Sequence, residues 1–155
     1  MTKGFNDHAV EGISPSTIKN QAPLPDISVN EFIRIYHIER HYNKETIYSQ
    51  LELTVIQVNR MLKNWLNQQT SLNPDQIIIY KHLVGYLTRA KLELIYTSPD
   101  SLKEMNEKLK HKLALKRYYE LEAAKYLKAL CGINFDLTES ALGSNFSAAL
   151  IDGDI

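Results

Sequence analysis

Apolar residues recur every three or four positions between residues 44 and 68, and this spacing predicts a helix with one apolar face. Its members are Ile47, Leu51, Val55, Val58, Leu62, Trp65 and Leu66. Ahead of it, Ser28 and Glu31 have the spacing of a capping box, in which the hydroxyl and the carboxylate each bond a free backbone N–H. We expect a short helix from there to about Arg40, and Asn43 can cap the long helix that follows.

A third helix is predicted from a strong start signal. Asn73, Pro74 and Gln76 supply a cap, a first-turn proline and a capping-box partner for a helix that runs to about residue 96. This helix is apolar on more than one face, which is typical of a helix buried at the centre of a bundle. Glycine weakens a helix by about 1 kcal/mol relative to alanine, so Gly85 within it predicts a close helix crossing.

A fourth helix is expected over about 99–131, after the start signal Ser98-Pro99-Asp100, and Gly132 is placed to terminate it. No strand-type alternation and no hairpin dipeptide is found. The predicted fold is therefore an all-α bundle over residues 30–132, with one short and three long helices joined by short loops. Extended segments flank the bundle: an N-terminal arm, residues 1–29, and a C-terminal tail, residues 133–155.

The N-terminal arm holds three of the five prolines, Pro15, Pro23 and Pro25. Proline lacks a backbone donor and restricts the residue before it, so we expect little regular structure here. The arm nevertheless contains apolar residues, which suit contact with a partner or neighbouring subunit: Phe5, Val10, Ile13, Ile18, Leu24 and Ile27. The alternative is that the arm packs on its own domain or is disordered.

Charge is distributed unevenly, although the formal net charge is zero. Residues 30–132 carry 16 Lys or Arg against 11 Asp or Glu, whereas the tail has four acidic residues and no basic one. Either the tail contacts a partner, or it is weakly attracted to the basic centre of its own chain. The tail residues expected to dock on a partner are Phe135, Phe146, Leu150, Ile151, Asp152, Asp154 and Ile155.

Composition excludes several classes of protein. The 155 residues include one cysteine, which rules out an intramolecular disulfide framework and cysteine-rich zinc sites. No apolar run approaches the roughly 20 residues that span a membrane, so no membrane contact is expected. The first residues lack the apolar stretch of a signal peptide, so we expect the chain to stay in the cytoplasm where it is made.

Candidate catalytic and metal-binding residues are few. His37 and His41 are four residues apart and could share a metal with Glu45, but Asn43 is expected to end their helix, so solvated or capping roles are favoured. Cys131 lies at a helix C-terminus, where the helix dipole disfavours a thiolate, and is interpreted as a core cysteine. No nucleotide-binding or nucleophile-elbow motif occurs. We expect neither enzymatic activity nor a cofactor.

A basic segment runs from Lys103 to Arg117. Its basic residues are Lys103, Lys108, Lys110, Lys112, Lys116 and Arg117. Such a helix can contact DNA phosphates without reading base sequence. These residues spread around the helix, however, so a simple solvated face is the alternative. The predicted helices are too long for a helix-turn-helix reader.

Two short motifs carry a resemblance to a known family. One is Val58-Asn59, followed by Leu62 and Trp65; the other is Arg89-Ala90-Lys91, followed by Leu94 and Tyr96. With the order and length of the helices, they make residues 32–132 similar to the head completion proteins of tailed bacteriophages, the gpL-type family of temperate contractile-tailed phages. One departure is Ser98-Pro99-Asp100-Ser101, where the family often has an Asp-Thr pair.

The resemblance implies a structural protein of the virion. Proteins of that family are α-helical connectors that form a ring beneath the portal, usually twelvefold, after the packaging motor leaves. The ring retains the DNA and presents a platform to the next neck, head-closure or tail-terminator protein. The implied partners are the portal protein, that next protein, further copies of this chain and packaged DNA. The alternatives are a small helical adaptor that binds a partner helix and a ring-forming subunit of a packaging terminase.

Overall fold

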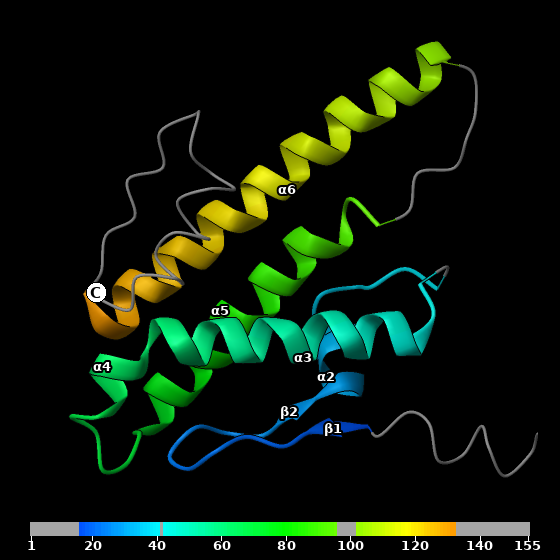
Figure 1. The fold of residues 1–155 in the computed structure, drawn as a ribbon. Coiled ribbons are helices and arrows are strands. Elements are labelled where there is room, and N and C mark those ends of the chain that lie inside the picture. Colours follow the sequence, from blue (N-terminus) through cyan, green and yellow to red (C-terminus); the bar gives the residue numbers. More distant parts are fainter. Residues whose placement is uncertain (1–15, 41, 96–101, 133–155) are drawn as a thin grey trace, which may run out of the picture.

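The protein is a helical bundle with a short hairpin at one end (Figure 1). The structure, a computed structural model, describes residues 16–40, 42–95 and 102–132, the first four residues of the last range by backbone alone. Its elements are β1 (Thr17–Ile18), β2 (Ile27–Ser28), α2 (Val29–Ile35), α3 (Lys44–Met61), α4 (Lys63–Leu66), α5 (Pro74–Leu92) and α6 (Leu102–Cys131). The predicted all-α class is confirmed.

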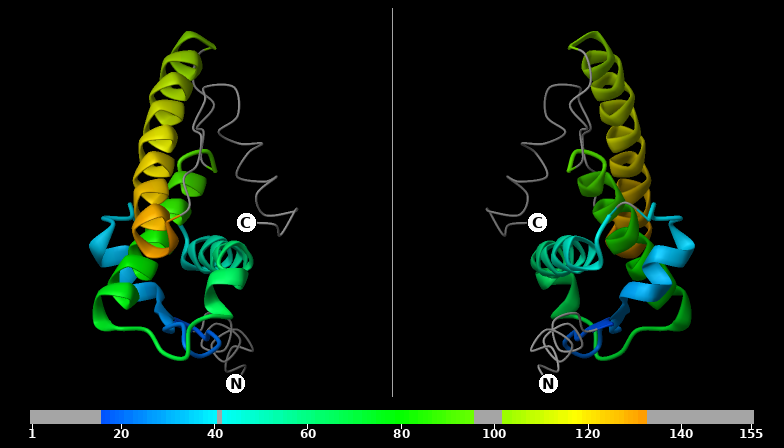
Figure 2. Two further views of the ribbon diagram at one scale, coloured as in Figure 1. Left: turned by 90° about the vertical axis from the view of Figure 1, so that its left-hand side faces the viewer. Right: turned by 90° about the vertical axis from the view of Figure 1, so that its right-hand side faces the viewer.

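Helix α5 is the central element, and it packs against both α6 and α3. Figure 2 shows α3 nearly end-on while α6 runs along the length of the view, so these two helices approach α5 in different directions. Tyr80, Leu83 and Val84 of α5 are fully buried, which explains why its apolar residues occupy more than one face. None of the helices in the described ranges is both long enough and apolar enough to span a membrane.

Three predicted helix ends are confirmed atom by atom. Asn73 Oδ1 accepts from the Gln76 backbone at 2.8 Å, and the Gln76 side chain accepts from the Asn73 backbone at 2.9 Å, which completes the capping box of α5. Asn43 Oδ1 accepts from the Thr46 backbone at 2.7 Å and caps α3. Gly132 has a φ of +74° and donates to the Lys128 carbonyl at 2.8 Å, as a terminating glycine does.

The first helix is shorter than predicted, because α2 ends at Ile35 and not near Arg40. His37 adopts a left-handed φ of +49°, and the next N–H, that of Ile38, donates to the Ile33 carbonyl at 3.1 Å. This is the Schellman arrangement that usually contains glycine, and histidine is one of the few other residues found in that conformation. Ile38, just after this turn, is buried. Its packing therefore fixes the end of α2, for which the sequence contains no terminating glycine or proline.

The long helix predicted over 44–68 is divided into α3 and α4 at Leu62. Leu62 is fully buried, and its neighbours Trp65 and Leu66 on α4 also pack on the core. The chain changes direction at Leu62, where α4 turns away from the axis of α3 (Figure 1). This turn keeps Trp65 and Leu66 in contact with the rest of the bundle.

The second half of the predicted N-terminal arm belongs to the folded unit. Strands β1 and β2 pair antiparallel, with Ile18 opposite Ile27, although no strand was expected here. Ile18, Leu24 and Ile27 are buried in the main core. Of the two interpretations left open, packing on the chain's own domain is correct for residues 16–29, and residues 1–15 lie outside the described ranges.

Helix α6 extends past the end of α5 (Figure 1). Both views of Figure 2 show its N-terminal part rising beyond the other described elements. The half of α6 that contains Ala123 and Leu127 is buried against α5. The other half has no comparable cover among the described helices.

Candidate functional site

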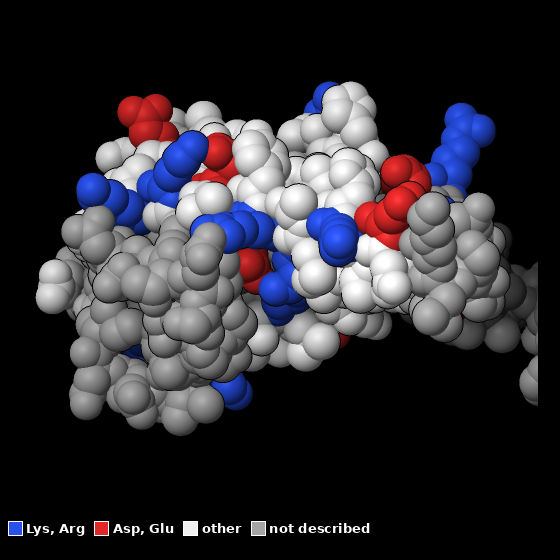
Figure 3. Space-filling view, turned by 90° about the horizontal axis from the view of Figure 1, so that it is seen from above, with Lys and Arg blue, Asp and Glu red and all other residues white. Residues whose placement is uncertain are grey.

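The basic segment lies on the projecting half of α6. Lys108, Lys110 and Arg117 are exposed, whereas Lys112 and Lys116 are half-buried. Lys116 Nζ lies 2.6 Å from the Glu120 carboxylate, so part of the positive charge is neutralised within the helix. On the face seen in Figure 3, basic side chains form separate groups with acidic and uncharged residues between them. The side chain of Lys103 is outside the described part.

Two leucines form an apolar strip on the same half of α6. Leu109 is 41% exposed and Leu113 is 47% exposed. Four residues apart, they share one face of the helix, and the same face continues to the buried residues Ala123 and Leu127. We call Leu109 and Leu113 the α6 strip. The ion pair Lys116–Glu120 lies on this face between the two apolar stretches. The second stretch is covered by α5, whereas the leucines of the first are exposed.

An apolar groove of about 250 Å³ lies between α2 and α5. Its lining includes Phe32 and Ile35 of α2 and Ile77 and Ile78 of α5, and we call it the α2/α5 groove. Ile35 is 40% exposed and Ile78 is 54% exposed. The charged groups in the lining are the ion pair Glu31–Lys81, whose atoms are 3.5 Å apart. The Glu31 carboxylate thus faces Lys81 and not the helix start that the capping-box prediction assigned to it.

Asn59 connects the hairpin loop to the central helix. Its Nδ2 donates to Asn20 Oδ1 at 2.9 Å, and its Oδ1 accepts from the Tyr80 hydroxyl at 2.7 Å. Asn20 Nδ2 donates in turn to the Tyr80 hydroxyl at 2.8 Å. Each of the three side chains therefore bonds the other two. Val58, the other residue of that motif, is fully buried, so both motif positions hold the fold together.

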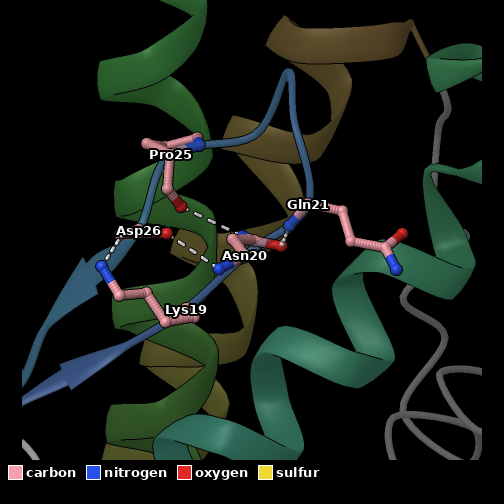
Figure 4. Close-up of polar contacts among 5 residues, drawn as sticks. All are labelled: Lys19, Asn20, Gln21, Pro25 and Asp26. Carbon is pink, nitrogen blue, oxygen red and sulfur yellow. Dashed lines mark hydrogen bonds and ion pairs between the residues drawn. The ribbon is translucent and has the colours of Figure 1, made fainter.

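Polar contacts within the loop between β1 and β2, residues 19–26, join its two ends (Figure 4). Asn20 Nδ2 also donates to the Pro25 carbonyl at 3.0 Å, and the Asn20 backbone donates to Asp26 Oδ1 at 2.8 Å. Lys19 Nζ donates to Asp26 Oδ2 at 2.9 Å. The hydrogen bond from Lys19, followed by that from the Asn20 backbone, lowers the pKa of Asp26. These hydrogen bonds hold the hairpin loop in one conformation.

The second motif lies where α5 meets its neighbours. Arg89 is buried, with its guanidinium 3.3 Å from the Glu93 carboxylate and 5.3 Å from the centre of the Tyr119 ring on α6. Ala90 is buried, and Lys91 donates to the Gln57 side chain of α3. Positions 89 and 91 thus join α5 to α6 and to α3 respectively. Tyr96, the last motif residue, lies outside the described ranges.

Lys91 gives the protein a measurable pH dependence. Burial lowers the pKa of Lys91 to about 8 from its ordinary value of 10.5. Below pH 8 the amine is protonated in both states, so the folded protein bears the full cost of burying the charge. Between pH 8 and 10.5 only the unfolded chain retains the proton, so stability rises with pH through this window.

We therefore expect the urea midpoint of the wild type, relative to that of Lys91→Met, to be higher at pH 10 than at pH 7. The exposed residue Lys128 provides the control, because Lys128→Met should show no such pH-dependent difference. A gap between Lys91→Met and the wild type that stays constant with pH would contradict this assignment.

Aromatic side chains of α2, α5 and α6 form a continuous cluster that the sequence analysis did not anticipate. The Tyr36 hydroxyl and His82 Nδ1 are 2.8 Å apart, and His82 stacks on Tyr126 at 5.1 Å between ring centres. Tyr86 stacks on Tyr126 at 5.5 Å and on Tyr119 at 6.3 Å. Burial raises the pKa of Tyr36. The sequence signals for this cluster are helical spacings, those of His82, Tyr86 and Arg89 along α5 and of Tyr119 and Tyr126 along α6.

The remaining candidates do not form a site in the described residues. No group of three or more His, Cys, Asp or Glu that could hold a metal occurs within them. His37 follows the end of α2, so it does not share a helix with Glu45, and His41 lies outside the described part. Cys131 is half-buried against the core and its thiol donates to the Leu127 carbonyl at 3.2 Å. The tail residues predicted to dock, from Phe135 onwards, also lie outside the described ranges.

Comparisons with protein family models, with curated protein sequences and with solved structures give no significant match to this chain. What the structure defines is a helical protein with two apolar surfaces, the α6 strip and the α2/α5 groove, on a tightly bonded frame.

Proposed function

We propose that this chain is a structural head completion protein of a tailed bacteriophage, a connector subunit that forms a ring beneath the portal. In this role it stabilises the DNA-filled head and provides the surface on which the neck or tail is attached. Its working location is the neck of the virion. The chemistry of the role is binding, and no residue is assigned to catalysis.

The observation that carries the proposal is the projecting half of α6. Leu109 and Leu113 lie on the helix face that is buried farther along, beyond the Lys116–Glu120 ion pair, yet they are 41% and 47% exposed. Exposed apolar surface of this kind marks sites of protein association. A ring subunit needs a rigid bundle with such surfaces on its sides, because each copy contacts two neighbours around a closed axis.

The motif residues that underlie the resemblance also support the proposal. Asn59 and Lys91 form hydrogen bonds across elements of the bundle, and the Arg89 guanidinium packs on the Tyr119 ring of α6. These contacts hold the helices of the bundle in fixed positions relative to one another. The basic residues of α6 do not form a single face, and the proposal does not require them to contact DNA.

The direct test is electron microscopy of the full chain mixed with the portal protein of the same phage. We expect a closed ring of density beneath the portal, with one copy of this chain per portal subunit. A portal that remains bare at a large excess of the chain would overturn the proposal.

We expect the C-terminal tail to be the portal-binding element. Its acidic and apolar residues suit an extended segment that orders on a partner. Deletion of residues 140–155 should abolish portal binding, measured by co-sedimentation, and leave the helical circular dichroism of the bundle unchanged. Retained binding by the shortened chain would show that the tail has another role.

A second candidate function is a helical adaptor outside any phage. The α2/α5 groove favours it, because an apolar groove can accept a partner's amphipathic helix. The same microscopy experiment separates the two, since an adaptor would leave the portal without a ring.

A further inference from the structure

The α6 strip requires a covering surface, and the structure restricts what that surface can be. Leu109 and Leu113 lie on the same helix face that packs on α5 farther along, beyond the Lys116–Glu120 ion pair. An apolar helix face that changes from buried to exposed part-way along one helix is most simply completed by another protein surface. In a ring, that surface belongs to a second copy of this chain.

Two α6 strips are poorly suited to face each other. Residues 106–120 contain five Lys or Arg and two Glu, one of which pairs with Lys116, so the segment around Leu109 and Leu113 keeps a net positive charge. Antiparallel pairing of two such segments would bring like charges together, which is destabilising. The covering surface therefore differs from the strip, which makes the contact heterologous, as ring closure requires.

Among the described residues, the other exposed large aliphatic side chains are Ile35, Leu53, Ile56, Ile78, Leu94 and Ile95. Leu94 and Ile95 lie at the end of α5, level with the strip itself: Arg89 packs on Tyr119, so residue 95 comes opposite about residue 113. A strip that docked there would meet the basic segment of the second copy's own α6, so these residues are a poor acceptor for it.

The outer side of α3 also fits poorly. Ile56 lines a hollow of about 400 Å³ between α3 and the hairpin loop, together with the basic residues Lys19, Arg60 and Lys63 and the single acid Glu52. Lys19 is paired with Asp26, but Arg60 and Lys63 still outnumber Glu52, so this hollow is net positive and suits a basic helix poorly. Leu53 lies outside both hollows.

The α2/α5 groove has the properties that the strip needs. It is concave and apolar, and its exposed residues Ile35 and Ile78 come from two different elements. Its charges are balanced, since Glu31 and Lys81 form an ion pair. A helix that presents leucines at positions i and i+4 matches the general mode in which amphipathic helices bind grooves.

We propose that the α6 strip of one copy, Leu109 and Leu113, packs into the α2/α5 groove of the next copy, and that this contact repeats around the ring. The inference rests on the proposed function, which it deepens by naming the two faces. Within one chain the surfaces cannot meet. His82 stacks on Tyr126, so Ile78 lies level with about residue 130, and 17 residues of helix separate that level from Leu113, roughly 25 Å.

The test is cysteine crosslinking in a Cys131→Ser background, which removes the single native thiol. The double variant Ile78→Cys/Leu113→Cys is oxidised on the portal and, separately, alone at high concentration. We expect a ladder of covalent dimers, trimers and larger species, because each copy supplies one thiol to each neighbour. Mixing the two single variants should give dimers only. Disulfides form only when the Cα atoms come within about 7 Å, so the ladder reports direct contact.

The matched control is Leu53→Cys/Leu113→Cys, which places the first thiol at an equally exposed leucine of α3; it should give no ladder. A ladder from this control, or dimers from Leu113→Cys alone, would overturn the inference. So would a ring on the portal in which the Ile78 and Leu113 cysteines remain uncrosslinked, and the proposed function would then survive. A ladder formed by the chain alone, with the portal left bare, would support the contact and overturn the connector role.

A second measurement protects the test against misfolding. Leu113→Glu should remove the ring density beneath the portal and leave the circular dichroism unchanged, because the residue is at the surface of the isolated chain. Leu53→Glu should retain the ring. If Leu113→Glu also retains it, the α6 strip is not the contact.

Discussion

Gly85→Ala is expected to destabilise the protein by about 1–3 kcal/mol, although alanine is normally the better helix residue. A Cβ at position 85 would lie 2.2 Å from Cζ of Tyr36. That ring is not free to move aside. Its hydroxyl bonds His82, and it packs against Phe32 at 5.2 Å and Tyr86 at 5.2 Å between ring centres. The added methyl group must therefore displace the end of α2 from α5.

The steric origin of the effect can be tested by reversing its sign. In a Tyr36→Ala background the ring is absent, and Gly85→Ala should then stabilise the protein by up to about 1 kcal/mol through helix propensity. Urea unfolding of the four proteins in this double-mutant cycle gives the coupling between the two positions. If Gly85→Ala has the same effect in both backgrounds, the close contact with Tyr36 is not the reason for the glycine.

Asn59→Ala by itself is expected to lower the free energy of unfolding by about 1–3 kcal/mol. The substitution removes the acceptor of the Tyr80 hydroxyl and a donor to Asn20 Oδ1. Tyr80 is fully buried, so its hydroxyl proton loses its partner in a place from which bulk water is excluded. The cost is that of an unmet buried hydrogen bond, not that of a few lost methyl contacts.

This change should also loosen the hairpin selectively. The Val29 N–H, which donates to the Ser16 carbonyl at 2.9 Å, should exchange with solvent faster in Asn59→Ala, whereas amides of the N-terminal half of α6, which projects beyond α5 (Figure 1), should change little. Ser49 on the exposed face of the same helix supplies the control; Ser49→Ala should alter neither quantity appreciably. Unchanged Val29 exchange would mean that Asn59 does not hold the loop.

Gly85 illustrates how far sequence reasoning reached. A glycine inside an apolar helix predicted a close approach, and the contact exists, but the sequence could not identify Tyr36 as the group that makes it. Likewise, Val58-Asn59 and Arg89-Ala90-Lys91 were noticed as motifs. That Asn59 bonds Asn20 and Tyr80 depends on three segments 21 to 60 residues apart in the chain.

The errors in the predicted element boundaries have a common cause. Strands β1 and β2 are two residues long, too short for an alternating pattern, and α2 stops at a left-handed histidine and not at a glycine. In both places the backbone is held by contacts made elsewhere: Ile18 and Ile27 pack in the core, and so does Ile38. Local propensity could not report these contacts.

The sequence by itself determined the helical class, the order of the helices and the capped ends at Asn43, Asn73 and Gly132, because periodicity and capping depend on residues within one or two turns. The tertiary structure decided that the hairpin of residues 16–29 packs into the core and that the motif residues brace α5. It also decided that Leu109 and Leu113 are exposed, because none of the described helices covers that part of α6. Burial is a property of the packed chain. The same leucine spacing is core at one end of α6 and candidate interface at the other.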